Sequence, residues 1–322
     1  MTITGRIAPQ GSDLPVLITP KFTGETLHEA FQRLQVDIEG LITTVGGVLL
    51  RGFSVPEIAD FKSFAASFGD PLLNYEFGST PRSAVSKGVY TSTSYPAHQH
   101  IPLHNEQAYT REWAKRIWFH CVTASKVGGE TPIADSRAIY NRMPLSIRNQ
   151  FEKGLLYVRN YGDFDLPWQQ VFNTENPAEV EAYCRRTQIQ FEWTEDDGLR
   201  TSQLCQGIET HYQTGEKLWF NQAHLFHISN LQPEVRESLE GMLDLEEMPR
   251  NVYYADGSVI SDEVFDEVRQ VLAQETVLFP WQDGDVVMLD NMLVAHGRTP
   301  FEGPRKVVVA MAGSHGNLEQ QL

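Results

Sequence analysis

Short runs of β-prone residues, widely separated along the chain, constrain the fold most. They follow Tyr90 and cover 117–123, 155–161, 217–220, 286–289 and 306–311. Helical patterns interrupt them at 137–153, 177–186, 233–243 and 261–273. A doubly wound parallel sheet would need regular strand–helix alternation and a glycine-rich phosphate loop, and neither is present. The pattern therefore predicts a mainly β chain of the α+β class, with a jelly-roll (double-stranded β-helix) core and helical insertions.

The N-terminal part predicts two helices that flank one strand. Apolar residues recur at helical spacing over 27–41 and again over 58–68, and glycines follow both patterns. Between them, 48–53 predicts a buried strand. No internal repeat, low-complexity block or long polar linker interrupts the chain, so we expect one domain over 1–322.

The charge balance limits the partners of this chain. It has 42 acidic residues against 26 lysines and arginines, a formal net charge of −16, which argues against nucleic acid and anionic membranes. No stretch approaches the roughly 20 apolar residues of a membrane span, and residues 1–17 lack the apolar segment of a secretory signal. Cys121, Cys184 and Cys205 are widely spaced, which predicts reduced thiols and a cytoplasmic protein.

One local cluster of positive charge interrupts the acidic surface. Arg111, Lys115 and Arg116 lie close together in the sequence, with Glu112 among them. A solvated rim is the ordinary interpretation of such a cluster. The alternative is a local docking patch for an acidic partner.

A histidine and a glutamate stand two residues apart in Leu103-His104-Asn105-Glu106-Gln107. On a strand, side chains at i and i+2 point to the same face and can share one metal ion. Far along the chain, a turn and a buried strand lead to His296. Two imidazoles and one carboxylate form the facial set that binds non-haem iron(II) and leaves positions open for a chelating cosubstrate and for oxygen. Arg305, nine residues past His296, is placed to grip a carboxylate.

Two further histidine pairs offer weaker metal candidates. His98 and His100 form a His-x-His pair that could bind a metal in place of His104 and Glu106. A loop that lines the cleft is the favoured interpretation of this pair. His224 and His227 lie about one helical turn apart among aromatic residues, which favours hydrogen-bonded core histidines over metal ligands.

These motifs resemble the taurine dioxygenase and clavaminate synthase superfamily, and most closely its branch of syringomycin-type amino-acid hydroxylases, over about 48–311. The resemblance implies that His104, Glu106 and His296 bind iron and that Arg305 binds the distal carboxylate of 2-oxoglutarate. A Gly-Gly-Glu-Thr turn matches the family at Thr131, which is the implied partner hydroxyl. Trp281 and Asp290-Asn291 match family residues that precede the late histidine, and the resemblance makes Trp281 a further candidate for binding 2-oxoglutarate.

Two positions narrow the implied chemistry. Related halogenases vacate the carboxylate position, so the presence of Glu106 disfavours halogenation. Some relatives hold an anionic substrate group with a second arginine four residues past the cosubstrate arginine, and here that residue is Val309. Candidate substrate contacts lie elsewhere, at Tyr109, Arg82, Thr93, His100 and Arg298.

The expected function is hydroxylation of an unactivated C–H bond of an amino acid or amino-acid-derived intermediate, with iron(II), 2-oxoglutarate and O2, in natural-product biosynthesis. Desaturation or ring formation is the first alternative, and an aminoacyl group tethered to a carrier protein is an alternative substrate. A chain with a net charge of −16 repels an acidic carrier, so a free small molecule is favoured. Two alternative functions lie outside the oxygenase class: a non-catalytic binding protein and a zinc hydrolase.

Overall fold

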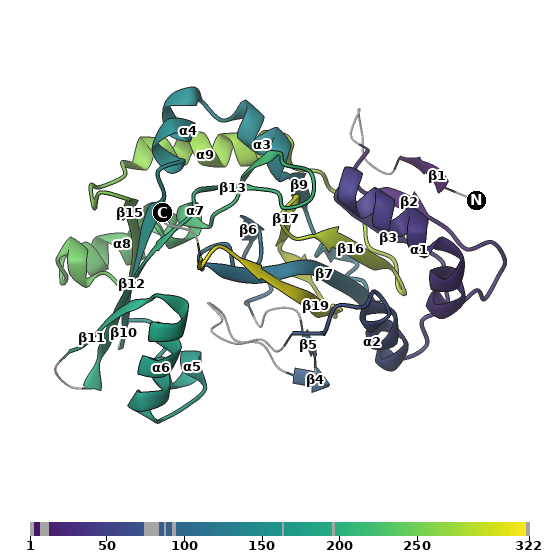
Figure 1. Cartoon of the computed structure of the whole chain (residues 1–322), viewed down its shortest axis with the longest axis horizontal. Helices are drawn as coiled ribbons and strands as arrows, with labels where there is room; N and C mark the ends of the chain where they lie inside the picture. The colour runs from purple at the N-terminus through teal and green to yellow at the C-terminus, as the bar shows by residue number, and fades with distance from the viewer. Residues whose placement is uncertain are drawn as a thin grey trace.

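The central feature of the computed structural model is an eight-stranded sheet (Figure 1). The structure describes residues 3–6, 13–73, 84–86, 88–91, 95–162, 164–194 and 197–319. In spatial order the strands are β1 (Ile3–Arg6), β2 (Val16–Ile18), β3 (Gly47–Leu50), β16 (Val286–Asp290), β7 (Glu112–Thr123), β19 (Lys306–Gly316), β5 (Val89–Thr91) and β4 (Ala84–Ser86). Neighbouring strands are antiparallel except β2 and β3.

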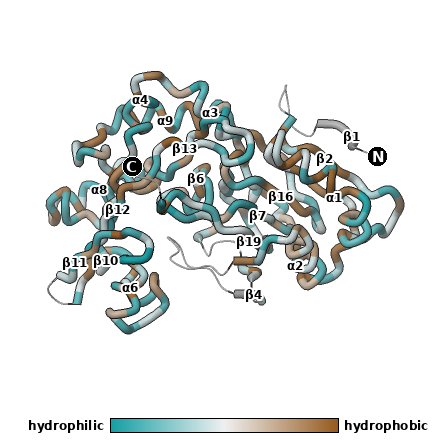
Figure 2. The backbone as a smooth tube through the Cα atoms, in the orientation of Figure 1, coloured by the Kyte–Doolittle hydropathy of each residue, from teal (hydrophilic) through white to brown (hydrophobic). Residues whose placement is uncertain are grey.

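Both faces of this sheet are buried. Successive side chains of a strand point to opposite faces, so neighbouring residues enter different core clusters. In β16, Val287 faces one core cluster, whereas Val286 and Met288 face another. The second cluster is covered by α1 (Leu27–Thr44) and α2 (Ile58–Ala66). Hydrophobic and hydrophilic segments alternate along α1 in Figure 2, as expected for a helix with one side against a core.

A smaller sheet packs against the other face and carries the residues of interest. It consists of β6 (Ile101–His104), β17 (Val294–Arg298) and β9 (Ile133–Asp135), in the order β6-β17-β9. Its Val294 and Ile133 share one buried cluster with Phe119 of the large sheet. Beside it, β8 (Val127–Gly128) pairs with β18 (Phe301–Glu302). The two sheets thus enclose a common apolar core.

The inserted segments form a third layer around another sheet. This sheet has the order β11 (Gln190–Trp193), β12 (Leu199–Cys205), β10 (Leu155–Tyr161) and β15 (Arg250–Tyr254), and a hairpin of β13 (Ile208–Thr210) and β14 (Lys217–Trp219) lies apart from it. The inserted helices are α3 (Ser136–Arg142), α4 (Leu145–Phe151), α5 (Trp168–Phe172), α6 (Pro177–Thr187), α7 (Ala223–Phe226), η2 (Ile228–Asn230), α8 (Pro233–Glu240), η3 (Leu245–Glu247) and α9 (Asp262–Glu275).

The predicted fold class is confirmed, but the bounds of two strands and one helix differ from those predicted from the sequence. The runs predicted at 117–123 and 306–311 are the apolar parts of longer strands, β7 and β19, which extend into polar residues. Their backbones pair with each other along most of their length, so the ladder continues where the apolar pattern ends. The second helix ends at Ala66, two residues short of the predicted end.

The basic cluster predicted from the sequence is not a basic patch in the structure. Arg111 is buried and donates hydrogen bonds to Asn317. Arg116 pairs with Glu39, and the Lys115 ammonium lies 4.0 Å from a carboxylate oxygen of Asp70. Two of the three cations thus face acidic residues from distant segments and the third is buried, so these three residues do not form an exposed basic patch.

All three cysteines are buried with free thiols, as predicted. Among the described helices, none has the length and apolar character needed to cross a membrane.

Candidate metal centre and cosubstrate site

Strand pairing brings two histidines together from opposite parts of the sequence. β17 pairs antiparallel with β6, and His296 stands directly opposite His104 in that register. Side chains of directly opposed residues share one face of a sheet and lie close together. The two imidazole ring centroids are 4.6 Å apart.

Glu106 completes the group, but from a turn rather than from a strand. β6 ends at His104, and the chain then turns through Gln107, whose φ is 60°. The expectation that His104 and Glu106 share a strand face is therefore wrong. A carboxylate oxygen of Glu106 nevertheless lies 3.8 Å from Nε2 of His296. The three potential ligand atoms lie within 4.8 Å of one another, and no other such group of three occurs among the described residues.

The side chain of Asn291 holds the turn that carries Glu106. Its Oδ1 accepts a hydrogen bond from the Glu106 N–H at 2.7 Å, and its Nδ2 donates to the carbonyl oxygens of Glu106 (3.0 Å) and Ala114 (2.9 Å). Asn105 reinforces the arrangement, because its Nδ2 donates to the Asn291 carbonyl at 2.7 Å. Gln222 in turn donates to the carbonyl of Asn105. A buried amide network thus replaces strand geometry in placing the carboxylate.

Hydrogen bonding fixes the tautomer of His104. Its Nδ1 lies 2.9 Å from the carbonyl oxygen of Pro102. A carbonyl can only accept, so Nδ1 carries the proton and Nε2 presents a lone pair for a metal.

Two further histidines near this site, His224 and His227, are structural. They are buried and hydrogen-bonded to the carbonyls of Leu103 and Ile260, as predicted for core histidines. Burial is the main cause that lowers the pKa of His224 to about 3 and that of His227 to about 4. Both rings are therefore neutral near pH 7, and they lie outside the three-ligand group.

The three-ligand group fits iron(II) in its chemistry. It offers two imidazole nitrogens and one carboxylate oxygen, without a thiolate, which is the facial set of non-haem iron(II) oxygenases. Glu106 and His296 are at most 5% exposed, so these two ligands would shield a bound ion from bulk water.

The three residues implied for 2-oxoglutarate come together from separate segments. Nε1 of Trp281 donates a hydrogen bond to Oγ1 of Thr131 at 3.1 Å. Nε of Arg305 donates to the carbonyl of Gly129 at 2.8 Å. Gly129 has a φ of +77°, and a Cβ there would lie 2.9 Å from Cδ of Arg305, so this close approach requires glycine.

The electrostatics of Arg305 favour an anion. Burial, and secondarily the positive charge of Arg298, lower the pKa of Arg305 to about 10. The guanidinium remains charged near neutral pH, although burial destabilises its charged form. A bound carboxylate would offset this cost of burying the charge. The site therefore fits the distal carboxylate of 2-oxoglutarate.

Replacing Arg305 with glutamine is expected to weaken 2-oxoglutarate binding about ten- to a hundredfold, the range for losing a hydrogen bond between charged groups. The affinity is measured by anaerobic titration of the iron-loaded protein, following the visible charge-transfer band. Lys306→Gln removes the adjacent, exposed cation and is expected to leave the affinity unchanged. Equal affinities in the Arg305 variant and the wild type would contradict this role.

A cavity of about 730 Å³ lies beside the metal-ligand group. His104 and Glu106 line it, and its described walls also include Tyr95, His98, Gln99, His100, Ile101, Pro102, Gln222, Leu225, Phe226, Asn230, Gln232, Arg250 and Pro300. The volume is within the roughly 300–1,000 Å³ typical of small-molecule sites.

The predicted substrate contacts lie in different places relative to this cavity. His100 lines it. Tyr109 is not among its described lining residues, because its ring packs against Phe226 at 5.1 Å beside a separate cavity of about 30 Å³. Arg298 is neither a surface ion pair nor a wall residue: it donates to the carbonyls of Tyr95, Pro96 and Gln99 and so ties down the loop that bears His98 and His100. Arg82 and Thr93 lie outside the described residues.

Comparison with known proteins identifies the chain's relatives. Residues 10–311 match the family described as "Taurine catabolism dioxygenase TauD, TfdA family". This chain belongs to the TauD, TfdA family. It is an iron(II)- and 2-oxoglutarate-dependent dioxygenase, which confirms the enzyme class, the two cofactors and the superfamily predicted from the motifs.

Named relatives cover nearly the whole chain. Dapdiamide synthesis protein DdaC of Enterobacter agglomerans is 41% identical over 92% of this chain and 90% of its own length. Clavaminate synthase-like protein At3g21360 of Arabidopsis thaliana is 32% identical over 95% of this chain and 92% of its own. The solved structure of PvcB from Pseudomonas aeruginosa shares the fold, with a TM-score of 0.56 at 17% identity, over 96% of this chain and 92% of that one.

Proposed function

We propose that this enzyme hydroxylates an unactivated C–H bond of an amino acid or an amino-acid-derived intermediate in natural-product biosynthesis. The observation that carries the proposal is the buried His104, Glu106 and His296 group at the wall of a cavity of small-molecule size. Similarity to a protein named for dapdiamide synthesis supports the biosynthetic setting. Membership of the syringomycin-type branch is part of this proposal.

Each residue of the site has a definite task in this scheme. His104, Glu106 and His296 would hold iron(II), while Arg305 and Thr131 would hold the distal carboxylate of 2-oxoglutarate. Trp281 orients the hydroxyl of Thr131 through its hydrogen bond. Iron(II) with 2-oxoglutarate, when bound, supplies the activation of O2. Because Glu106 occupies the carboxylate position, hydroxylation is favoured over halogenation.

The cavity wall suits a substrate with both polar and apolar parts. The polar residues Gln99, Gln222 and Gln232 line it, and Leu225 and Phe226 add apolar surface. Polar groups orient a ligand in such pockets while apolar walls exclude water. A small amino-acid-like molecule fits this composition.

We also propose that residues 1–322 act as one catalytic domain in the cytoplasm. The supporting observations are the shared core of the two main sheets and the three buried, free thiols. A free small-molecule substrate is favoured over a carrier-tethered one, because acidic side chains engage the basic residues that would dock a carrier.

The test is anaerobic titration of the protein with iron(II) and then 2-oxoglutarate, followed by aerobic assays with amino-acid substrates. We expect a charge-transfer band, and succinate release coupled to a product that gains one oxygen atom. A product that loses two hydrogen atoms would instead indicate desaturation or ring formation. Absence of the band in folded, iron-loaded protein would overturn the assignment of the site.

A further inference from the structure

One aromatic ring lies between the large cavity beside the metal-ligand group and a second, smaller cavity. Phe226 lines the cavity of about 730 Å³ and also the cavity of about 30 Å³. Among the described lining residues, it is the one that both cavities share. The side chain of Phe226 is therefore part of the partition between the two spaces.

The neighbours of the Phe226 ring come from the walls of both cavities. Tyr109 and Tyr157 line the small cavity, and their ring centroids lie 5.1 Å and 5.0 Å from that of Phe226. Arg250 lines the large cavity, and its guanidinium carbon lies 5.8 Å from the same centroid. These distances are those of packed aromatic and cation–π contacts. Removal of the ring would therefore open the large cavity toward the small one.

Burial places Phe226 at the inner end of the large cavity. The lining residues His98 and His100 are exposed, which marks the mouth. Phe226 is 6% exposed and the metal-ligand residue Glu106 is 5% exposed, so both belong to the inner end. A substrate whose reacting carbon faces the metal must therefore fit the neighbouring part of its side chain against this end.

The short helix α7 fixes Phe226 relative to the metal-ligand group. Gln222 precedes the helix, and its Nε2 donates a hydrogen bond to the carbonyl of Asn105 at 2.7 Å. Within the helix, Nε2 of His224 lies 2.9 Å from the carbonyl oxygen of Leu103. These two carbonyls belong to the residues on either side of His104. The distance between the ring and the metal-ligand group is thus set by hydrogen bonds to the ligand strand itself.

We propose that Phe226 determines which substrates this enzyme accepts, because its ring closes the inner end of the cavity against long side chains. This inference rests on the proposed function and narrows it: the substrate is an amino acid or derivative whose side chain is compact where it meets the inner end. In a hydrophobic pocket, one methylene group changes the preference between two substrates by about 10- to 200-fold. The small cavity provides the additional length once the ring is removed.

The experiment uses free L-amino acids with unbranched side chains of increasing length: L-2-aminobutyrate, L-norvaline, L-norleucine and L-2-aminoheptanoate. Binding to the anaerobic enzyme loaded with iron(II) and 2-oxoglutarate is followed by the change in the charge-transfer band. We expect the wild type to prefer the shorter members. Phe226→Ala should shift the preference toward the longer members by about 10- to 200-fold. Phe226→Leu opens less space and keeps more of the packing, so its shift should be intermediate and in the same direction.

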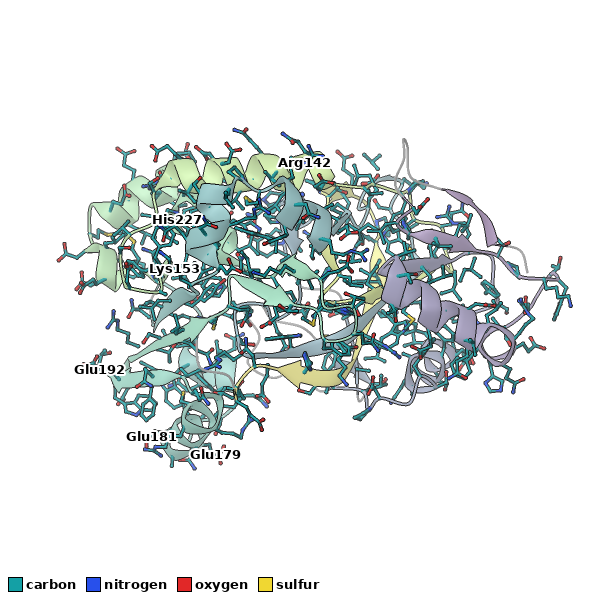
Figure 3. All side chains as sticks on the ribbon, turned by 45° about the horizontal axis from the view of Figure 1, so that its top comes forward. Arg142, Lys153, Glu179, Glu181, Glu192 and His227 are labelled. Carbon is teal, nitrogen blue, oxygen red and sulfur yellow. The ribbon has the colours of Figure 1, made fainter. Side chains whose placement is uncertain are left out.

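Phe265→Ala provides a matched control for the loss of a buried aromatic ring. Phe265 is fully buried in the same core cluster as Phe226, and it is not among the described lining residues of either cavity. Its ring packs at 4.4 Å on that of His227, the residue after Phe226 (labelled in Figure 3). This variant should lose stability and keep the wild-type preference. The band of each variant before addition of the amino acid detects loss of iron or 2-oxoglutarate.

The possible failures are distinguishable. A wild type that forms no band overturns the proposed function and this inference together. If the wild type forms the band, an unchanged length preference in the folded Phe226 variants overturns this inference alone, and so does failure of the wild type and both variants to bind any member. A shift of equal size in Phe265→Ala also overturns it, because general loosening of the core would then explain the change.

Discussion

Replacing His296 with alanine is expected to abolish iron(II) binding and turnover. The imidazole stands opposite His104 in the strand register and lies 3.8 Å from the carboxylate of Glu106, so no neighbouring group replaces it. Changing a residue that merely orients a metal ligand costs about 10–100-fold in affinity or activity. Losing one of three ligands should cost more than a hundredfold. Iron content after desalting and the charge-transfer band with 2-oxoglutarate measure the effect.

His227→Ala provides a matched control for the loss of a buried imidazole. His227 is 3% exposed and His296 is 4% exposed, but His227 is hydrogen-bonded to Ser229 and Ile260 instead of facing the ligand group. This variant should lose stability and keep its iron. If His296→Ala binds one iron with wild-type affinity, or if both variants lose iron equally, the proposed ligand set is wrong.

The sequence predicted the identity of the metal-ligand group better than its geometry. His104 and Glu106 were expected on one strand face, yet the strand ends at His104 and a turn carries Glu106. Residue type and spacing constrain which side chains can act together. They do not reveal that the Asn291 amide, 185 positions away, holds the Glu106 backbone on both sides.

The wall of the cavity was less accessible to prediction, for a physical reason. Arg250 and Phe226 reach this wall from segments far in sequence from the metal ligands, and neither stands in a recognisable local motif. Arg298 and Tyr109 were chosen for their nearness in sequence to the metal ligands. The structure instead uses Arg298 to anchor backbone carbonyls and Tyr109 to pack against Phe226. Proximity along a strand says little about the direction of a side chain in the finished site.

The amide network around Asn291 links stability to metal binding. Asn291 is fully buried, and its side chain satisfies the Glu106 N–H together with the carbonyls of Glu106 and Ala114. Groups of this kind are costly to leave unpaired away from water. The same hydrogen bonds set the position of the Glu106 backbone, and therefore of its carboxylate. One substitution should accordingly disturb both properties.

Asn291→Leu, which keeps the branched shape of the side chain, is larger and removes the hydrogen bonds, is expected to lower the free energy of unfolding by about 3 kcal/mol or more, since three buried groups each lose a partner worth about 1–3 kcal/mol. Iron(II) affinity should fall about 10–100-fold as Glu106 loses its support. Urea unfolding and iron titration measure the two effects. Asn317→Leu removes an equally buried amide that contacts Arg111 and Glu209, and it should destabilise the protein without changing iron affinity. Unchanged iron affinity in folded Asn291→Leu would show that Glu106 is positioned without this network.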